Sequence, residues 1–122
     1  MIEAAFLEDG NHHTLDISGH AELGREFPVP CARCEHCPET WGNLICAAAS
    51  VLGQSLLCHL KQMEGEVEIL REVHGAGRLA VDCVGGAAVT ELFALVRTGL
   101  RQLAAAYPQH VRVNEGRKKG ET

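Results

Sequence analysis

Apolar and polar residues alternate near the start of the chain, which is the pattern of β-strands. Residues 2–8 and 12–18 flank Asp9-Gly10-Asn11, a tripeptide able to supply the positive φ of a tight hairpin turn. In the second segment Leu15 and Ile17 alternate with polar residues, so one face of that strand is expected to be buried and the other hydrated. The pattern therefore predicts an opening β-hairpin.

A helical pattern follows a long stretch without periodicity. From Gly19 to Gly42 glycines and prolines interrupt the sequence, and a loop of this length inside a compact domain is usually functional or disordered. Asn43 is then expected to cap a helix that runs to Glu64-Gly65. Gly53 lies inside this helix and indicates close packing there. The expected buried face consists of Ile45, Ala49, Leu52, Leu56, Leu60 and Met63.

The second half repeats the order of two strands and a helix. Residues 67–73 and 79–83 alternate around a glycine-containing turn, and Gly85-Gly86 ends the hairpin. A helix over Ala87–Ala106 stops before Pro108, and Val111 begins a short last strand. The face of this helix that we expect to be buried consists of Ala88, Leu92, Leu95, Val96, Leu103 and Tyr107.

The predicted order is β-β-α-β-β-α-β, which indicates an α/β protein of the α+β type. Each amphipathic helix needs a sheet face, so the simplest packing is a mixed β-sheet with both helices on one face. The uncovered face is either solvated or a dimer interface. We expect a single domain over residues 1–115, with a Cys-rich insertion at 25–41, and a flexible basic tail at 116–122.

Composition narrows the function. The 122 residues are 46% hydrophobic but only 4% aromatic, so the core should be aliphatic. A net charge of −5 disfavours direct nucleic-acid binding. The sequence lacks a secretory signal and an apolar run long enough to span a membrane. Six cysteines in such a chain are typical of thiols in a reducing cytoplasm, which is the location we expect.

Cys46 is a candidate nucleophile. If Asn43 caps the helix, Cys46 lies in its first turn, where unpaired amides and the helix dipole favour a thiolate and offer an oxyanion hole. The alternative is that Cys46 is a small buried apolar residue. His20 directly follows Gly19 at the end of the second strand and is a candidate general base.

These segments carry a family resemblance. Ser18-Gly19-His20-Ala21-x-x-Gly24, followed by Asn43-Leu44-Ile45-Cys46-Ala47-Ala48-Ala49-Ser50, resembles the signature of the ribosomal-processing cysteine protease (Prp) family. The resemblance implies a homodimeric, cytoplasmic cysteine endopeptidase that removes the N-terminal extension of a bacterial large-subunit ribosomal protein. It assigns Cys46 as the nucleophile and His20 as the general base, with no cofactor.

The supporting residues and departures complete the expected site. Gly19, Asn43 and Ser50 are expected to support catalysis. Ser50 lies one turn after Cys46 and can touch substrate; the alternative is that its hydroxyl bonds back to its own helix. Family members usually have an aspartate where this chain has Asn43. The connection between His20 and Cys46 is also longer here than is usual, and a longer loop costs little entropy.

The insertion contains a second motif. Cys31, Cys34 and Cys37, with His36, have the spacing of ligands for zinc or an iron–sulfur cluster, but no second Cys-x-x-Cys completes the set. A non-catalytic metal-binding or ribosome-assembly module that uses this loop is therefore the alternative function. The remaining cysteines, Cys58 and Cys83, are interpreted as core residues, and His12 and His13 as solvated.

Overall fold

The computed structural model describes residues 1–19, 38–75 and 77–116, with side chains in the first helix from residue 45. The elements are β1 (Ile2–Asp9), β2 (His12–Ser18), α1 (Pro38–Gln62), β3 (Val67–Gly75), β4 (Arg78–Gly85), α2 (Ala87–Ala106) and β5 (Val111–Gly116). This order confirms the predicted β-β-α-β-β-α-β sequence. Because β5 extends to Gly116, the first residue of the expected tail belongs to the sheet, and residues 117–122 lie outside the described part.

The five strands form one mixed sheet in the order β3-β4-β2-β1-β5. The β1–β2, β2–β4 and β3–β4 pairs are antiparallel. The β1–β5 pair is parallel, with Ile2 opposite Val111. The first and last strands of the described chain are therefore neighbours.

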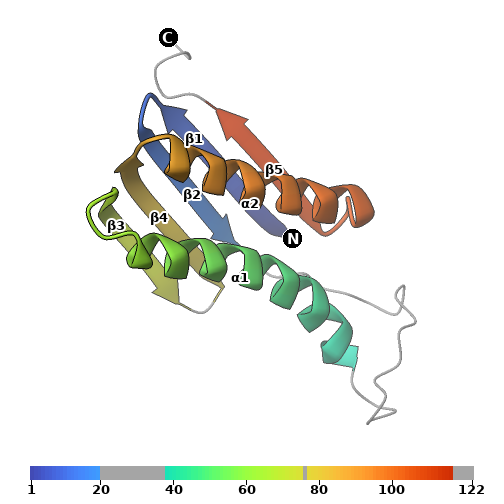
Figure 1. Cartoon of the computed structure of the whole chain (residues 1–122). Helices are drawn as coiled ribbons and strands as arrows, with labels where there is room; N and C mark the ends of the chain where they lie inside the picture. The colour runs from blue at the N-terminus through green and yellow to red at the C-terminus, as the bar shows by residue number, and fades with distance from the viewer. Residues whose placement is uncertain (20–37, 76, 117–122) are drawn as a thin grey trace.

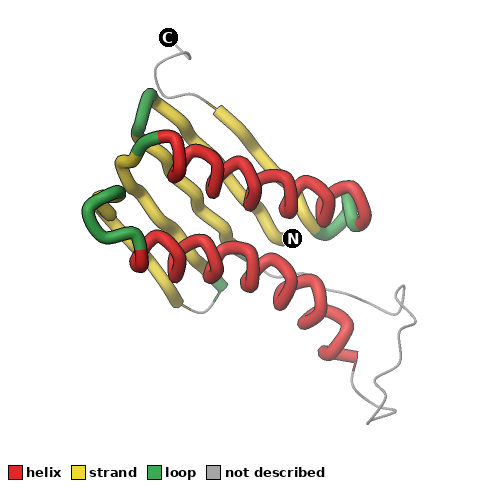
Figure 2. Tube along the Cα trace, viewed as in Figure 1, coloured by secondary structure: helices red, strands yellow, loops and turns green. Residues whose placement is uncertain are grey.

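Both helices cover the same face of the sheet, as predicted (Figures 1 and 2). Most of the core between the two layers is aliphatic, and it also contains Phe6, Met63, Cys83 and Phe93. Its fully buried side chains come from both layers and include Ile2, Leu15, Leu60, Val81, Val89 and Leu100. The result is the two-layer α+β architecture expected from the sequence.

Glycines let the layers approach closely. A Cβ on Gly53 of α1 would lie 2.9 Å from Cδ1 of Ile17 in β2 and 3.1 Å from Cδ2 of Leu79 in β4. A Cβ on Gly99 of α2 would lie 2.8 Å from Cδ2 of Leu52 in α1. The close packing predicted at Gly53 is thus confirmed, and a second glycine brings the helices together.

The start of α1 differs from the expected one. The helix begins at Pro38 rather than after Asn43, so residues 38–41 of the expected insertion belong to it. Proline is favourable at the first position of a helix, because its ring fixes φ near the helical value and its missing N–H would have no partner there. Asn43 is therefore inside the helix and does not cap it.

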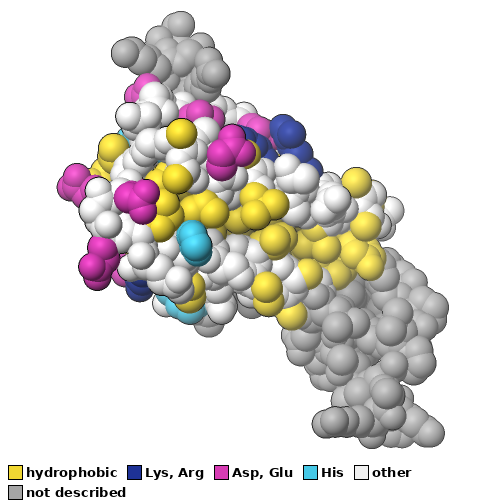
Figure 3. Space-filling model, in the orientation of Figure 1, with side chains coloured by type: hydrophobic (Ala, Val, Ile, Leu, Met, Phe, Trp, Pro, Cys, Tyr) yellow, Lys and Arg dark blue, Asp and Glu magenta, His cyan; other side chains and the backbone are white. Residues whose placement is uncertain are grey.

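The buried face of α2 is also rotated from the expected one. Leu95 is 68% exposed and Ala88 is exposed, whereas Val89, Phe93, Val96 and Leu100 are buried. Apolar residues cover more than half of this helix, so their spacing did not define one face. Val51 of α1 is exposed as well. Figure 3 shows hydrophobic side chains gathered on the side of the molecule that carries the helices.

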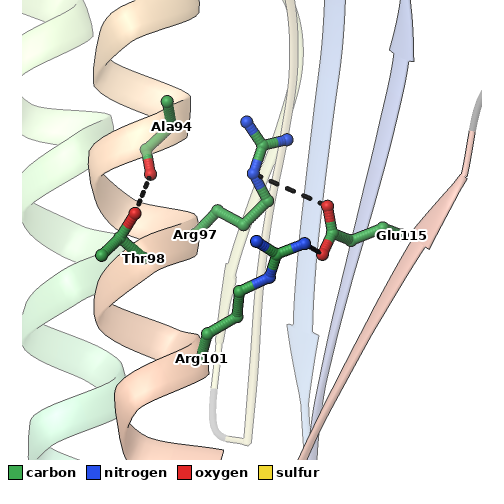
Figure 4. A network of polar contacts seen from close by, with 5 residues as sticks. All are labelled: Ala94, Arg97, Thr98, Arg101 and Glu115. Atoms are coloured by element: carbon green, nitrogen blue, oxygen red, sulfur yellow. Dashed lines mark hydrogen bonds and ion pairs between the residues drawn. The ribbon is translucent and has the colours of Figure 1, made fainter.

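An ion-pair cluster fixes α2 to the edge strand β5. Glu115 of β5 pairs with Arg101 and, at 3.7 Å between Oε1 and Nε, with Arg97 (Figure 4). The Arg97 guanidinium also lies over the ring of Phe6, 5.7 Å from its centroid. Arg97 is mostly buried, so the contacts with Glu115 and Phe6 offset the cost of removing its guanidinium from water.

The two histidines near the first turn are not solvated as expected. His13 is only 2% exposed, stacks on Phe93 and lies 3.1 Å from the Thr90 hydroxyl through Nε2. His12 points to the opposite face of the sheet, is partly buried and pairs with Asp82. His13 shares the inward parity of Leu15 and Ile17, so strand geometry buries it under α2.

Candidate active site

A cleft of about 250 Å³ lies between the sheet and α1. The helix contributes Cys46, Ala49, Ser50, Gly53 and Gln54 to its lining. Positions 46, 50 and 54 are one helical turn apart, so these three side chains follow one stripe of α1. Cys46 is half-buried at one end of that stripe.

The sheet supplies the apolar floor of the cleft. Ile2, Ile17 and Leu79 line it from β1, β2 and β4, and all three are buried. Because Gly53 has no side chain, α1 packs directly against Ile17 and Leu79 at this floor. The combination of an apolar floor and a polar helical rim is typical of a site for an organic ligand with polar groups.

Gly19 also lines the cleft, together with Cys46. Its φ is +94°, and a Cβ there would overlap the carbonyl oxygen of Met1, so only glycine fits without strain. Its N–H donates to the Gly77 carbonyl at 3.0 Å, which ties the end of β2 to the β3–β4 turn. His20 is the next residue and lies outside the described part of the chain.

The helix-start argument for Cys46 is wrong. Cys46 lies about two turns inside α1, because the helix begins at Pro38. Only the first four amides of a helix lack an internal partner, and the dipole effect is confined to the terminal turn. The amides of the first turn therefore do not provide an oxyanion hole at Cys46.

The structure locates some of the other expected site residues. Ser50 is exposed and lines the cleft one turn from Cys46. Asn43 belongs to α1, and its side chain is not among those described. Cys31, Cys34, His36 and Cys37 lie outside the described residues. Within residues 1–19, 38–75 and 77–116, no group of three or more His, Cys, Asp or Glu side chains is arranged to hold a metal ion.

The structure adds polar cleft residues that the sequence did not indicate. His74 comes from the end of β3 and Gln54 from α1. Arg78 also lines the cleft, but its guanidinium is bound by Asp16, with Nη2 to Oδ2 at 2.8 Å. No local motif marks His74, because its proximity to the cleft depends on how β3 pairs with β4.

The three described cysteines differ in environment. Cys83 is fully buried in β4, as predicted, and burial followed by the charge of Asp82 raises the pKa of its thiol to about 11. Cys58 is exposed on α1, so its interpretation as a core residue is wrong. It lies opposite the stripe of Leu56 and Leu60, which a helical projection predicts. Of the three, Cys46 is the one in the cleft.

A half-buried cysteine beside a ligand-sized cleft in a two-layer α+β fold is an arrangement suited to nucleophilic catalysis. The sequence matches the family described as cysteine protease Prp over residues 1–112, so the protein is a cysteine peptidase. The chain therefore belongs to that family, which confirms the resemblance found in the sequence. Comparison with curated proteins finds no match.

Solved structures share the fold. SMU.848 from Streptococcus mutans has a TM-score of 0.67 and 21% identity, with 97% of this chain and 99% of that one covered. The essential ribosomal processing protease Prp from S. aureus, bound to a covalently linked product peptide, has a TM-score of 0.65 and 15% identity, with 94% and 99% covered. The same protease with a substrate peptide has a TM-score of 0.63, 15% identity and the same coverage.

No helix in the described part of this chain combines the length and hydropathy of a membrane span.

Proposed function

We propose that this peptidase removes the N-terminal extension of a bacterial large-subunit ribosomal protein, with Cys46 as nucleophile and His20 as general base. The observation that carries the proposal is that Cys46 and Gly19, the residue before His20, line one cleft. Family membership supports the same chemistry. The protease from S. aureus with this fold is named as a ribosomal processing protease, which supports the substrate class.

In the proposed mechanism, His20 takes the proton of the Cys46 thiol and the sulfur attacks the scissile carbonyl carbon. The tetrahedral intermediate then collapses, the C–N bond breaks, and His20 gives its proton to the leaving amine. Water, deprotonated by His20, attacks the resulting thioester, releases the extension with a free carboxylate and restores the thiol. The apolar floor under Cys46 keeps substrate side chains out of water during these steps.

The developing oxyanion requires a donor other than the first-turn amides of α1. Ser50 is the cleft-lining hydroxyl one turn from Cys46 on the same stripe, and we assign it this role. A side-chain hydroxyl is a suitable donor because it can rotate toward charge that forms in the transition state. Asn43 stands where family members usually have an aspartate. We propose that its neutral amide orients the imidazole of His20 without supplying a negative charge.

The direct test is incubation with the ribosomal precursor from the same organism, followed by intact mass measurement. Wild type should shorten the precursor at a single bond, and Cys46→Ala should leave it intact. His20→Ala should reduce the rate by at least about 10²-fold. Cys58→Ala is the matched control, because Cys58 is an exposed cysteine on the same helix outside the cleft lining, and it should cleave normally. Cleavage by Cys46→Ala would refute the assignment.

The cellular setting is part of the proposal. The enzyme is proposed to act in the cytoplasm as a homodimer, and light scattering at working concentrations tests the second point. The non-catalytic alternatives are disfavoured by membership of a cysteine protease family. Full processing of the precursor in cells that carry only the Cys46→Ser variant would favour a non-catalytic function instead.

A further inference from the structure

His74 is placed on the helix side of the sheet by strand pairing. It lies directly opposite Leu79 in the antiparallel β3–β4 pair, and directly opposed residues have their side chains on the same face. Leu79 is buried under α1, with Cδ2 3.1 Å from the Cβ position of Gly53. The exposed imidazole of His74 is therefore level with Gly53 and lines the cleft from the strand side.

Arg78, the neighbouring basic residue, is committed elsewhere. Its Nε and Nη2 donate to the two carboxylate oxygens of Asp16 at 3.3 and 2.8 Å. Asp16 alternates with the inward-facing Leu15 and Ile17, so this ion pair lies on the sheet face without helices. Among the described cleft residues on the strands, His74 is thus the ionisable side chain directed toward α1.

The packing of Leu79 on Gly53 places His74 nearer to the middle of α1 than to Cys46. Gly53 is seven positions from Cys46 along α1, which corresponds to about 10 Å at 1.5 Å per residue. A base must approach the sulfur to roughly 3 Å. An extended peptide advances about 3.3 Å per residue, so a substrate with its scissile carbonyl at Cys46 reaches the level of His74 about three residues away.

We propose that His74 is a substrate-positioning residue that hydrogen-bonds to the main chain of an extended peptide about three residues from the scissile bond. A neutral imidazole carries one donor and one acceptor, which match the N–H and C=O groups of a peptide. Gln54 offers the same pair of groups from α1 at the same level of the cleft. Gly75 and Gly77 beside His74 place no side chain in the path of the peptide. This inference rests on the proposed role of Cys46 as nucleophile.

The test combines substitution at His74 with substrate length. Three precursor peptides serve as substrates. The long peptide has six residues on each side of the scissile bond. One shortened peptide keeps only two residues before the bond, and the other keeps only two residues after it. His74→Ala should lower kcat/KM on the long peptide about tenfold, mainly through KM, since one hydrogen bond is lost. His74→Gln should recover most of it. In one of the two shortened peptides the ratio of wild-type to His74→Ala kcat/KM should fall toward one. An equal loss on all three peptides would overturn the proposal.

A binding measurement separates this inference from the proposed function. Fluorescence anisotropy of the labelled long peptide is compared for Cys46→Ala and for the double variant Cys46→Ala/His74→Ala. We expect about tenfold weaker binding in the double variant, and equal affinities would refute the role of His74 even if the peptidase assignment stands. Absence of wild-type cleavage with a normal His74 effect on binding would instead refute the peptidase assignment alone. His59→Ala, an exposed histidine on α1 outside the cleft lining, is the matched control and should bind normally.

Discussion

Gly53 of α1 and Ile17 of β2 meet so closely that a methyl group on residue 53 would lie 2.9 Å from Ile17 Cδ1. This contact sets the height of α1 above the sheet at the cleft. It explains why a residue that weakens helices by about 1 kcal/mol relative to alanine is found in the middle of one.

Gly53→Ala should lower the free energy of unfolding by roughly 1 kcal/mol, because displacement of Ile17 and Leu79 outweighs the gain in helix propensity. It should also raise KM, since both displaced side chains floor the cleft. Urea unfolding and peptide kinetics measure the two effects. Ser55→Ala, at an exposed position of α1, should instead be neutral or slightly stabilising. Equal behaviour of the two variants would contradict the packing argument.

Ser50→Ala should reduce kcat by about 10²-fold with little change in KM, because the proposed hydrogen bond forms in the transition state. Ser50→Thr should recover part of the rate if its hydroxyl reaches the oxyanion. Steady-state kinetics on the long peptide decide this. A change confined to KM would show that Ser50 binds the ground state instead.

The buried His13 should make the protein less stable in mild acid. Burial under α2 lowers the pKa of His13 from its usual 6.5, so the unfolded chain binds more protons than the folded one below that pH. Its contribution is complete above pH 6.5 and is lost as pH falls through and below that value. Urea unfolding at several pH values should show a steeper loss for wild type than for His13→Gln. Parallel curves would argue against this linkage.

Alkylation should distinguish the three described cysteines. Cys83 should resist iodoacetamide at neutral pH in the folded protein, because it is buried and its thiol has a pKa of about 11. Cys46 should react, and faster than the exposed Cys58 if a base assists it. Peptide mapping by mass spectrometry follows each site, with urea-unfolded protein as the control in which Cys83 becomes reactive. Rapid labelling of Cys83 in the folded state would be inconsistent with the structure.

Removing the charge of Glu115 should destabilise the contact between α2 and β5. Glu115→Gln leaves Arg97 and Arg101 without this carboxylate and should lower the free energy of unfolding by about 1 kcal/mol, less at high salt. Glu91 is an exposed acidic residue of α2, and Glu91→Gln should have a smaller effect. Chemical unfolding at low and high salt tests both variants. A Glu115→Gln effect no larger than that of Glu91→Gln would assign no special role to the cluster.

The sequence predicted the elements and their order because strand alternation and glycine or proline boundaries are local signals. The alternation of Leu15 and Ile17 also contained the information that His13 points inward, although a polar residue near a turn suggests solvent. The face of α2 was not recoverable, because apolar residues such as Leu95 occupy both sides of the helix and only packing against the sheet selects among them.

Only the site residues that lie within local sequence motifs could be predicted from the sequence. The motif from Asn43 to Ser50 indicated Cys46, and the spacing of one turn from Cys46 indicated Ser50. Gly19 was indicated by its position before His20. The start of α1 at Pro38 was missed because several glycines and prolines obscure it. His74 was beyond sequence reasoning, since the register of β3 on β4 decides its side of the sheet.

The pairing of β1 with β5 has a consequence for how the molecule is made. Ile2 cannot find its partner Val111 until nearly the whole described chain has left the ribosome, so one edge of the sheet stays open during synthesis. Long-range closure of this kind slows folding. A nascent chain therefore presents β1 as an unpaired sheet edge until translation has passed its final strand.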